Sequence, residues 1–125
     1  MKIIKEISER YSPMKFRDDI MITEHERELM FEAARWAASS FNEQPWRFIW
    51  ADRDAPEEYS KILEVLTEYN QGWASTAPLL IMVIGSDNFS KNGKKNKHSW
   101  YDTGMSVANM LTQAVSMGIQ AHQMG

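Results

Sequence analysis

Apolar residues recur at helical spacing in two segments of the first third of the chain. Three isoleucines between positions 3 and 7 predict a short amphipathic helix over residues 2–9. Pro13 lacks a backbone N–H and restricts the residue before it, so this helix ends upstream of it. A second helix is predicted to begin at Thr23, because Thr23 and Glu26 form a capping-box pattern ahead of an apolar stripe. We expect that helix to fray at Ser39, whose hydroxyl competes for backbone groups.

Strand patterns alternate with another helix in the middle of the chain. Aromatic residues at every second position predict a strand over residues 46–51, packed mainly on one face. A helix with one apolar stripe is predicted over residues 56–69, and the Asn-Gln-Gly run at 70–72 is expected to end it. Six consecutive apolar residues at 79–84 then predict an interior strand that is covered on both faces.

The last third of the chain predicts a loop, a long helix and a strand. The polar, basic residues 88–98 are expected to form a solvated and mobile loop. A helix follows over residues 99–117, and residues 119–124 predict a further strand. One face of the helix is predicted to carry Gly104, Ala108, Leu111 and Val115. This order of helices and strands, without an internal repeat, indicates a single α+β domain over residues 1–125.

Composition excludes several classes of function. The chain has 125 residues, enough for one hydrophobic core, and 43% of them are apolar. Its net charge of −3 gives no reason to expect nucleic acid as a partner, and no apolar run reaches the length of a membrane span. Cysteine is absent and the three histidines are not spaced as metal ligands, so no metal site is predicted. The N-terminus does not resemble a signal peptide, so a soluble cytoplasmic protein is the simplest expectation.

Polar chemistry is concentrated at two places. Residues 39–44 join a helix to a strand and carry hydroxyl and amide groups in greater number than a simple turn needs. Upstream, Arg10 and Ser12 share an irregular segment, and a guanidinium beside a hydroxyl suits a phosphate. The alternative for that pair is a surface arginine that pairs with Glu6 or Glu9, next to a turn serine.

The sequence offers no obvious acid, base or nucleophile. It contains no Gly-x-Ser-x-Gly elbow, no P-loop and no Gly-x-Gly-x-x-Gly fingerprint. If the protein is an enzyme, a bound cofactor is therefore expected to carry its reaction.

Several motifs resemble, in the same order, those of the FMN-dependent nitroreductase family. Arg-Tyr-Ser at residues 10–12, with Phe16, resembles the family's Arg-x-Ser…Phe opening. Ser-Ser-Phe-Asn-Glu-Gln-Pro-Trp at residues 39–46 resembles its Ser-Ser-x-Asn-x-Gln-Pro-Trp signature. An Ala-Pro pair before the second strand resembles the start of the family's central strand. Tyr-Asp-Thr-Gly at residues 101–104 is similar to its long central helix, and residues 121–125 are similar to the strand beyond it.

The resemblance implies a fold and an activity. The fold would be a nitroreductase-like mixed central sheet flanked by helices, in a homodimeric α+β flavoprotein with FMN at the homodimer interface. Electrons would pass from NAD(P)H through FMN to a nitroaromatic, quinone or similar small acceptor, in alternating (ping-pong) half-reactions. Neither nucleic acid nor a membrane would be a partner.

The resemblance also implies roles for individual residues. The implied cofactor-binding residues are Arg10, Tyr11, Ser12, Ser39, Ser40, Asn42 and Asn70. Arg10 and Ser12 would hold the FMN phosphate, with Tyr11 beside them. The three residues between 39 and 42 would reach the flavin and its ribityl chain from the other subunit. Asn70, at the end of its helix, would reach the isoalloxazine ring.

Two departures from the family pattern leave alternatives open. Met14 stands where the family usually has Arg or Lys as a second phosphate cation. The family's domain is also longer, so we expect the chain to lack the C-terminal third of that domain. One alternative is a flavin-binding relative that serves as a carrier or sensor without catalysis. The other is a plain α+β domain whose polar junction at 39–44 is only a turn.

Overall fold

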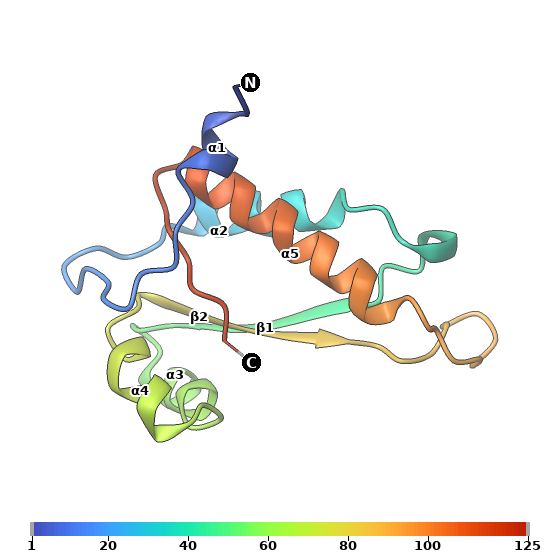
Figure 1. Cartoon of the computed structure of the whole chain (residues 1–125). Coiled ribbons are helices and arrows are strands. Elements are labelled where there is room, and N and C mark those ends of the chain that lie inside the picture. The colour runs from blue at the N-terminus through green and yellow to red at the C-terminus, as the bar shows by residue number, and fades with distance from the viewer. Residues whose placement is uncertain (1, 125) are drawn as a thin grey trace.

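The computed structural model describes residues 2–124, which place helices on both faces of a two-stranded sheet (Figure 1). The elements in chain order are α1 (Lys5–Ser8), α2 (Glu24–Arg35), the 3₁₀ turn η1 (Ser40–Asn42), β1 (Trp46–Asp52), α3 (Pro56–Leu63), α4 (Glu68–Ala74), β2 (Leu79–Gly85) and α5 (Ser99–Ser116). Helices α2 and α5 lie above the sheet in Figure 1, and α3 and α4 lie below it. The α+β class predicted from the sequence is confirmed.

The sheet separates two small apolar cores. Strands β1 and β2 pair antiparallel, with Trp46 opposite Gly85 and Asp52 opposite Leu79. Because successive side chains of a strand point to opposite faces, each face contributes to a different core. The core under α2 and α5 contains Met30, Ala34, Met110 and Ala114. The core on the face of α3 contains Ala51, Tyr59, Ala77 and Leu80.

Helix α2 begins where its capping box predicts. The Thr23 hydroxyl accepts a hydrogen bond from the Glu26 backbone N–H at 3.2 Å, and the Glu26 carboxylate accepts one from the Thr23 N–H at 2.8 Å. Two backbone donors at the helix start are thereby satisfied. The helix ends at Arg35, short of the predicted fraying point at Ser39. Its Ala34 is fully buried, and so small a side chain lets α2 approach α5 closely.

The predicted helix over residues 56–69 is two helices. Helix α3 ends at Leu63, and α4 begins after Thr67, whose hydroxyl accepts a hydrogen bond from the Asn70 N–H at 3.4 Å. The prediction that Asn70 ends its helix is therefore wrong, since Asn70 lies in the first turn of α4. Gly72 also lies inside α4, which shows that one glycine does not stop a capped helix.

The predicted face of small and apolar residues on α5 is exposed at its start. Gly104 and Ala108 are exposed, whereas Ser106 and Val107 are buried. Burial of the serine is tolerated because its hydroxyl donates to the Thr103 carbonyl at 2.8 Å. A buried serine whose hydroxyl hydrogen-bonds within its own helix leaves no apolar signal in the sequence.

Both ends of the chain differ from the prediction. Helix α1 spans only four residues, and Ile3, Ile4 and Ile7 are all more than half exposed. Residues 119–124 follow α5 without forming a strand. They run beside the N-terminal segment instead, joined to it by side chains of Gln120 and His122. The last residue of the predicted 121–125 motif, residue 125, lies outside the described residues.

Strand β2 is only partly covered, contrary to the prediction of an interior strand. Val83 and Ile84, toward its end, are exposed. Within residues 2–124 the sheet has two strands, so each strand has one edge without a hydrogen-bonded neighbour. Across the same described range, none of the helices is both long and apolar enough to cross a bilayer.

Candidate functional site

The polar junction at residues 39–44 is a tight, strained loop between α2 and β1. Three of its residues adopt the left-handed conformation, with φ of 54° at Phe41, 55° at Asn42 and 51° at Gln44. For a residue with a side chain, this conformation costs on the order of 1–3 kcal/mol. Such a conformation persists only where surrounding contacts hold it, and strained loops of this kind are typical of functional sites.

Three hydrogen bonds to side chains hold this loop in place. The Asp102 carboxylate of α5 accepts from the Ser40 N–H at 2.9 Å, and the Ser39 hydroxyl accepts from the Gln44 N–H at 3.0 Å. On the far side, the Glu43 carboxylate accepts from the backbone N–H of a residue after β2, Ser90, at 2.7 Å. The loop is therefore fixed to α5, to itself and to the segment that follows β2.

The same loop presents unused hydrogen-bonding groups to its surroundings. Within residues 2–124, the side chains of Ser40 and Asn42 have no hydrogen-bond partner, and Asn42 is exposed. Phe41, between them, is 93% exposed and contacts the Phe89 ring edge-on at a centroid distance of 5.9 Å. Neutral donors and acceptors held on a rigid backbone suit the polar edges of a planar heterocycle better than fixed charges do.

The second predicted cluster lies on the N-terminal segment. The Arg10 guanidinium donates to the Ser12 hydroxyl at 3.1 Å, and both residues are exposed. The alternative pairing of Arg10 with Glu6 or Glu9 is not seen, since Glu9 pairs with Lys5 at 3.6 Å. The remaining guanidinium donors stay available, and together with a hydroxyl they suit the oxygens of a phosphate.

Residues that follow α5 hold this N-terminal segment in place. The Gln120 side chain accepts from the Tyr11 N–H at 3.1 Å and donates to the Glu9 carbonyl at 3.2 Å. The His122 Nδ1 lies 2.8 Å from the Pro13 carbonyl oxygen. These anchors bracket Arg10 and Ser12. The sequence gives no sign of them, because they join residues more than a hundred positions apart.

Asn70 lies in α4, a helix that contacts the residues following α5. Its helix, α4, carries Trp73, whose ring lies 4.4 Å from the His122 ring and 6.5 Å from the Phe16 ring, measured between centroids. The Asn70 side chain has no hydrogen-bond partner within residues 2–124. It is therefore available to a ligand that reaches this end of the molecule.

The predicted site residues thus form two groups at opposite ends of α5 (Figure 1). The loop with Ser40 is fixed to Asp102 in the first turn of α5, whereas the segment with Arg10 is fixed to Gln120, beyond its last turn. At 1.5 Å per residue, the helix between Asp102 and its end at Ser116 is roughly 20 Å long, and Gln120 lies beyond that end. One chain therefore does not bring the two groups together.

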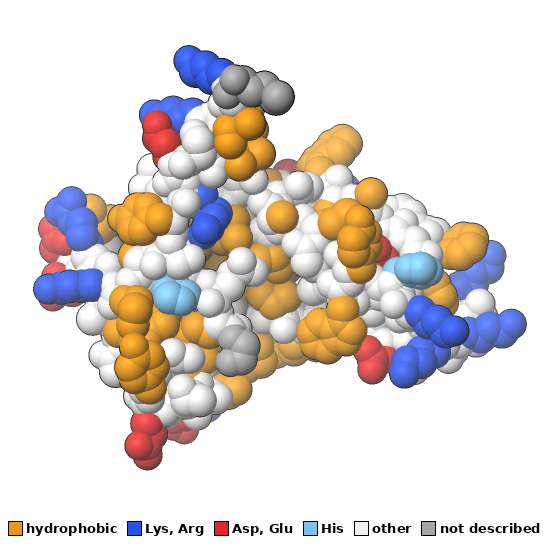
Figure 2. All heavy atoms as spheres, in the orientation of Figure 1, with side chains coloured by type: hydrophobic (Ala, Val, Ile, Leu, Met, Phe, Trp, Pro, Cys, Tyr) orange, Lys and Arg blue, Asp and Glu red, His pale blue; other side chains and the backbone are white. Residues whose placement is uncertain are grey.

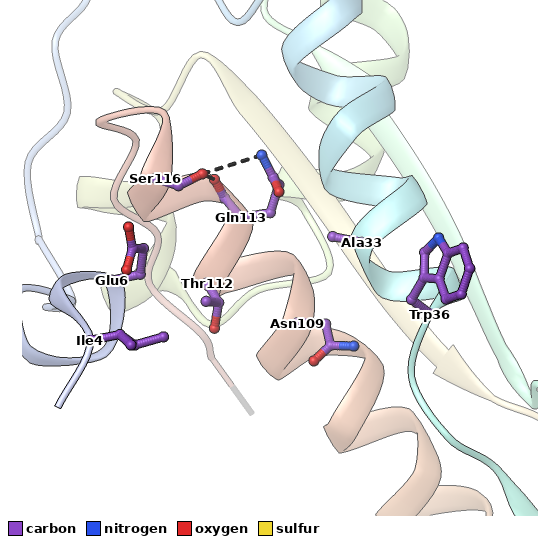
Figure 3. A pocket seen from close by; sticks show the side chains of 8 residues that line it. All are labelled: Ile4, Glu6, Ala33, Trp36, Asn109, Thr112, Gln113 and Ser116. Carbon is purple, nitrogen blue, oxygen red and sulfur yellow. Dashed lines mark hydrogen bonds between the residues drawn. The ribbon is translucent and has the colours of Figure 1, made fainter.

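The described residues also form a groove that is separate from both groups. A groove of about 370 Å³ lies between α1, α2 and α5 (Figure 3). It is lined by Ile4, Glu6, Ala33, Trp36, Asn109, Thr112, Gln113 and Ser116. None of the predicted cofactor-binding residues lines it.

One wall of this groove is fixed by a surface cluster at the end of α2. The Glu32 carboxylate accepts from Arg35 at 2.6 Å and from the Trp36 indole N–H at 2.8 Å. These bonds to the charged form, led by Arg35, lower the pKa of Glu32 to about 2. The cluster therefore stays ionised at ordinary pH and orients the Trp36 ring. Nothing in it suggests acid–base chemistry.

Comparison with known proteins shows one family model that spans both the Arg10 segment and the loop at residues 39–44. A family model described as "Nitroreductase family" matches residues 7–68, a range that includes six of the seven predicted residues and ends just before the seventh, Asn70. The range therefore covers both the Arg10 segment and the strained loop.

A curated relative and two solved structures are also similar. The Major NAD(P)H-flavin oxidoreductase of Aliivibrio fischeri is 34% identical over 56 residues, which are 45% of this chain and 26% of that protein. A crystal structure of an oxidoreductase containing FMN matches all of this chain and 64% of its own length, with a TM-score of 0.91 and 31% identity. A structure described as a nitroreductase from Desulfovibrio desulfuricans in complex with FMN matches 90% of this chain and 62% of its own, with a TM-score of 0.71 and 27% identity. The chain thus spans about a quarter of the curated relative and under two thirds of these structures.

Proposed function

Because the chain belongs to the nitroreductase family, we propose that it acts in an FMN-dependent oxidoreductase. In this proposal, electrons pass from NADH or NADPH through bound flavin to a nitroaromatic, a quinone or a similar small acceptor, in alternating half-reactions. A match that covers all of this chain, to a structure described as containing FMN, supports the cofactor. The name of the curated relative supports the nucleotide donor.

The strained loop at residues 39–44 is the observation that carries the proposal. A plain turn does not need three left-handed residues without a glycine, nor three side-chain hydrogen bonds to hold them. The strain is explained if the loop must present Ser40 and Asn42 to a ligand in one fixed arrangement. This argues against a plain domain whose junction has no role.

The residues present fit FMN chemically. Arg10 and Ser12 offer charge-assisted and neutral donors to the phosphate, and Tyr11 lies beside them. Asn70 and the loop residues offer neutral groups to the flavin edges. Bound FMN would supply the redox chemistry by accepting a hydride from the nicotinamide and passing electrons to the acceptor. The chain itself would bind and orient the reactants, which is consistent with its lack of an evident nucleophile.

We further propose that the site is completed by a second copy of the chain. The two groups of site residues lie at opposite ends of α5, so a single chain cannot hold one flavin with both. An antiparallel arrangement of two α5 helices would place the Ser40 loop of one subunit near the Arg10 segment of its partner. The exposed Gly104 and Ala108 on α5 leave room for such a close approach.

A visible spectrum followed by anaerobic addition of nucleotide tests the proposal. The purified protein should be yellow, or become yellow on addition of FMN, and should bleach with NADH or NADPH. A yellow protein inert to both nucleotides would instead support the flavin-binding carrier or sensor. That alternative is raised by Met14, which stands where the family usually has a second phosphate cation. A colourless protein that does not take up FMN would contradict both readings.

A further inference from the structure

The segment after β2 is a folded turn with a high local positive charge. Asn88 and Lys95 pair as an isolated antiparallel β-bridge. The Phe89 N–H donates to the Lys94 carbonyl at 2.8 Å, and the Asn96 N–H donates to the Asp87 carbonyl at 2.7 Å. We call residues 87–97 the basic turn. The solvated loop expected at residues 88–98 is thus a turn whose backbone is closed by these cross-turn bonds.

The lysines of the basic turn form no ion pair with any carboxylate in the described part of the chain. Lys91, Lys94, Lys95 and Lys97 are all exposed, and Asp87 is the only carboxylate among residues 87–97. None of the four ion pairs found in residues 2–124 involves these lysines. Figure 2 shows Lys and Arg side chains gathered at this end of the molecule. In a chain with a net charge of −3, this is a local reversal of sign that attracts anions.

Two contacts fix the basic turn to the strained loop. The Phe89 ring meets the Phe41 ring edge-on at 5.9 Å, and the Ser90 N–H donates to the Glu43 carboxylate at 2.7 Å. The bond from Ser90 also engages the Glu43 carboxylate, the nearest carboxylate of the loop. The lysines therefore stand beside the groups that we assign to the flavin, at a distance set by the fold. Arg10 and Ser12 of the same chain, which we assign to the FMN phosphate, lie at the other end of α5.

We propose that the basic turn binds the phosphate groups of the reducing dinucleotide and favours NADPH over NADH. This inference rests on the proposed function, because it assigns the donor of the same site. The 2′-phosphate of NADPH adds about −1.5 to −2 charge, the same as other phosphate monoesters near neutral pH. Lysines bind phosphate as flexible point charges, which suits a dinucleotide that must enter and leave in each cycle. The turn would thus recognise charge near the flavin without a ribose-reading fingerprint.

A double variant, Lys94→Gln with Lys97→Gln, tests this assignment in the full chain. Glutamine keeps the backbone bonds of the turn and removes two charges. The matched control, Lys2→Gln with Lys61→Gln, removes the same charge from two exposed positions outside the basic turn and the assigned flavin site. In anaerobic flavin reduction, we expect the KM for NADPH to rise about threefold to tenfold at low salt in the first variant, since exposed charge pairs are individually weak. The KM for NADH should rise less, and the control should leave the ratio of the two unchanged.

A direct binding measurement separates failure of this inference from failure of the proposed function. Adenosine 2′,5′-bisphosphate, titrated calorimetrically, should bind more weakly to the basic-turn variant than to the control, with increasing salt removing the difference. FMN affinity, measured from the flavin spectrum, should be the same in both variants.

Equal bisphosphate binding in both variants overturns the inference, and so does an equal rise in KM for the two nucleotides. A rise confined to the KM of an anionic acceptor would assign the turn to that acceptor instead. If neither nucleotide reduces the unaltered protein, the proposed function fails, and the bisphosphate titration still decides whether the turn recognises this phosphate.

Discussion

The carboxylate of Asp102, in the first turn of α5, accepts a hydrogen bond from the backbone N–H of Ser40 at 2.9 Å. Asp102 is 3% exposed, and Ser40 begins the 3₁₀ turn of the strained loop. A buried carboxylate on a long helix thus holds the loop that we assign to the flavin. The bond links the main scaffold of the fold directly to the geometry of the candidate site.

Replacing Asp102 should therefore affect both stability and cofactor binding. We expect Asp102→Ala to lower the free energy of unfolding by about 1–3 kcal/mol, because it leaves the Ser40 N–H without its acceptor. FMN affinity should fall as well, because three left-handed residues lose one of the bonds that hold them. Asp102→Asn keeps an acceptor oxygen and should cost less. Urea unfolding and an FMN titration measure the two effects.

Asp54→Ala is the matched control, since Asp54 is exposed and its side chain makes no hydrogen bond within residues 2–124. It should leave both measurements nearly unchanged. If Asp102→Ala behaved like this control, the loop would be held by its other contacts alone.

The sequence predicts short-range features of the site and misses the long-range ones. Residues 39–44 were recognisable because their polar groups are consecutive, and Arg10 and Ser12 because they are two positions apart. Asp102 could not be recognised as the anchor of Ser40, because 62 positions separate the two residues. Physically, residue types reveal which groups need a partner, but only the packed chain decides which partner they meet.

The fold shows the same limit. The capping box of Thr23 and the aromatic alternation in β1 act over a few residues, and the helix and strand that they predict are confirmed. The prediction that β1 packs mainly on one face is wrong, because Phe48 packs against one core and Ala51 belongs to the other. The break before α4 and the packed face of α5 depend on Thr67 and Ser106, whose hydroxyls satisfy backbone groups locally. A hydroxyl gives no hydrophobic signal, so periodicity alone predicts neither the break before α4 nor the burial of Ser106. The expected absence of a C-terminal third of the domain stays a prediction.

Gly85, at the end of β2, is required by close packing against α5. A Cβ at this position would lie 3.0 Å from the Ser99 Oγ and 3.2 Å from the Thr103 Oγ1, both on buried side chains. We expect Gly85→Ala to lower the free energy of unfolding by about 1–3 kcal/mol, the usual cost of overpacking. Adding Ser99→Ala removes the nearer atom and should restore part of the loss, as thermal unfolding would show.

Gly72 provides the comparison for this substitution. It lies in α4, and a Cβ there would meet nothing within 4 Å. Alanine in a helix interior is favoured over glycine by roughly 0.5–1 kcal/mol, so Gly72→Ala should stabilise the protein. Destabilisation by both glycine substitutions to the same extent would contradict the packing argument for Gly85.

Tyr59 makes the stability of the α3 core depend on pH in the alkaline range. Its hydroxyl donates to the Ala77 carbonyl at 2.6 Å and lies 3.2 Å from the Ala74 carbonyl. Burial raises the pKa of this phenol above its ordinary value of 10.0, and the nearby Arg53 charge opposes the rise more weakly. The folded state therefore holds the proton more tightly than the unfolded state does. Stability should be constant below about pH 10 and should fall as the pH rises from there through the folded pKa.

Tyr59→Phe tests this dependence. Loss of the hydroxyl should lower the free energy of unfolding near neutral pH by about 1–3 kcal/mol, because buried carbonyls lose their donor. It should also flatten the alkaline decline in stability measured by urea unfolding. Tyr69→Phe, at a position 74% exposed, should change neither quantity. An unaltered alkaline decline in Tyr59→Phe would assign the decline to another group.

Arg10 should contribute to FMN affinity through the phosphate. Among residues 2–124, no carboxylate pairs with the Arg10 guanidinium, which donates to the Ser12 hydroxyl at 3.1 Å. We expect Arg10→Ala to weaken FMN binding by roughly 1.5–3 kcal/mol, the range for hydrogen bonds to charged groups. Riboflavin, which lacks the phosphate, should bind the variant and the unaltered protein equally. Arg17→Ala is the control, because Arg17 is exposed and pairs with Asp19 at 2.6 Å. If flavin titrations gave the same FMN affinity for Arg10→Ala and Arg17→Ala, the phosphate would have to be held elsewhere.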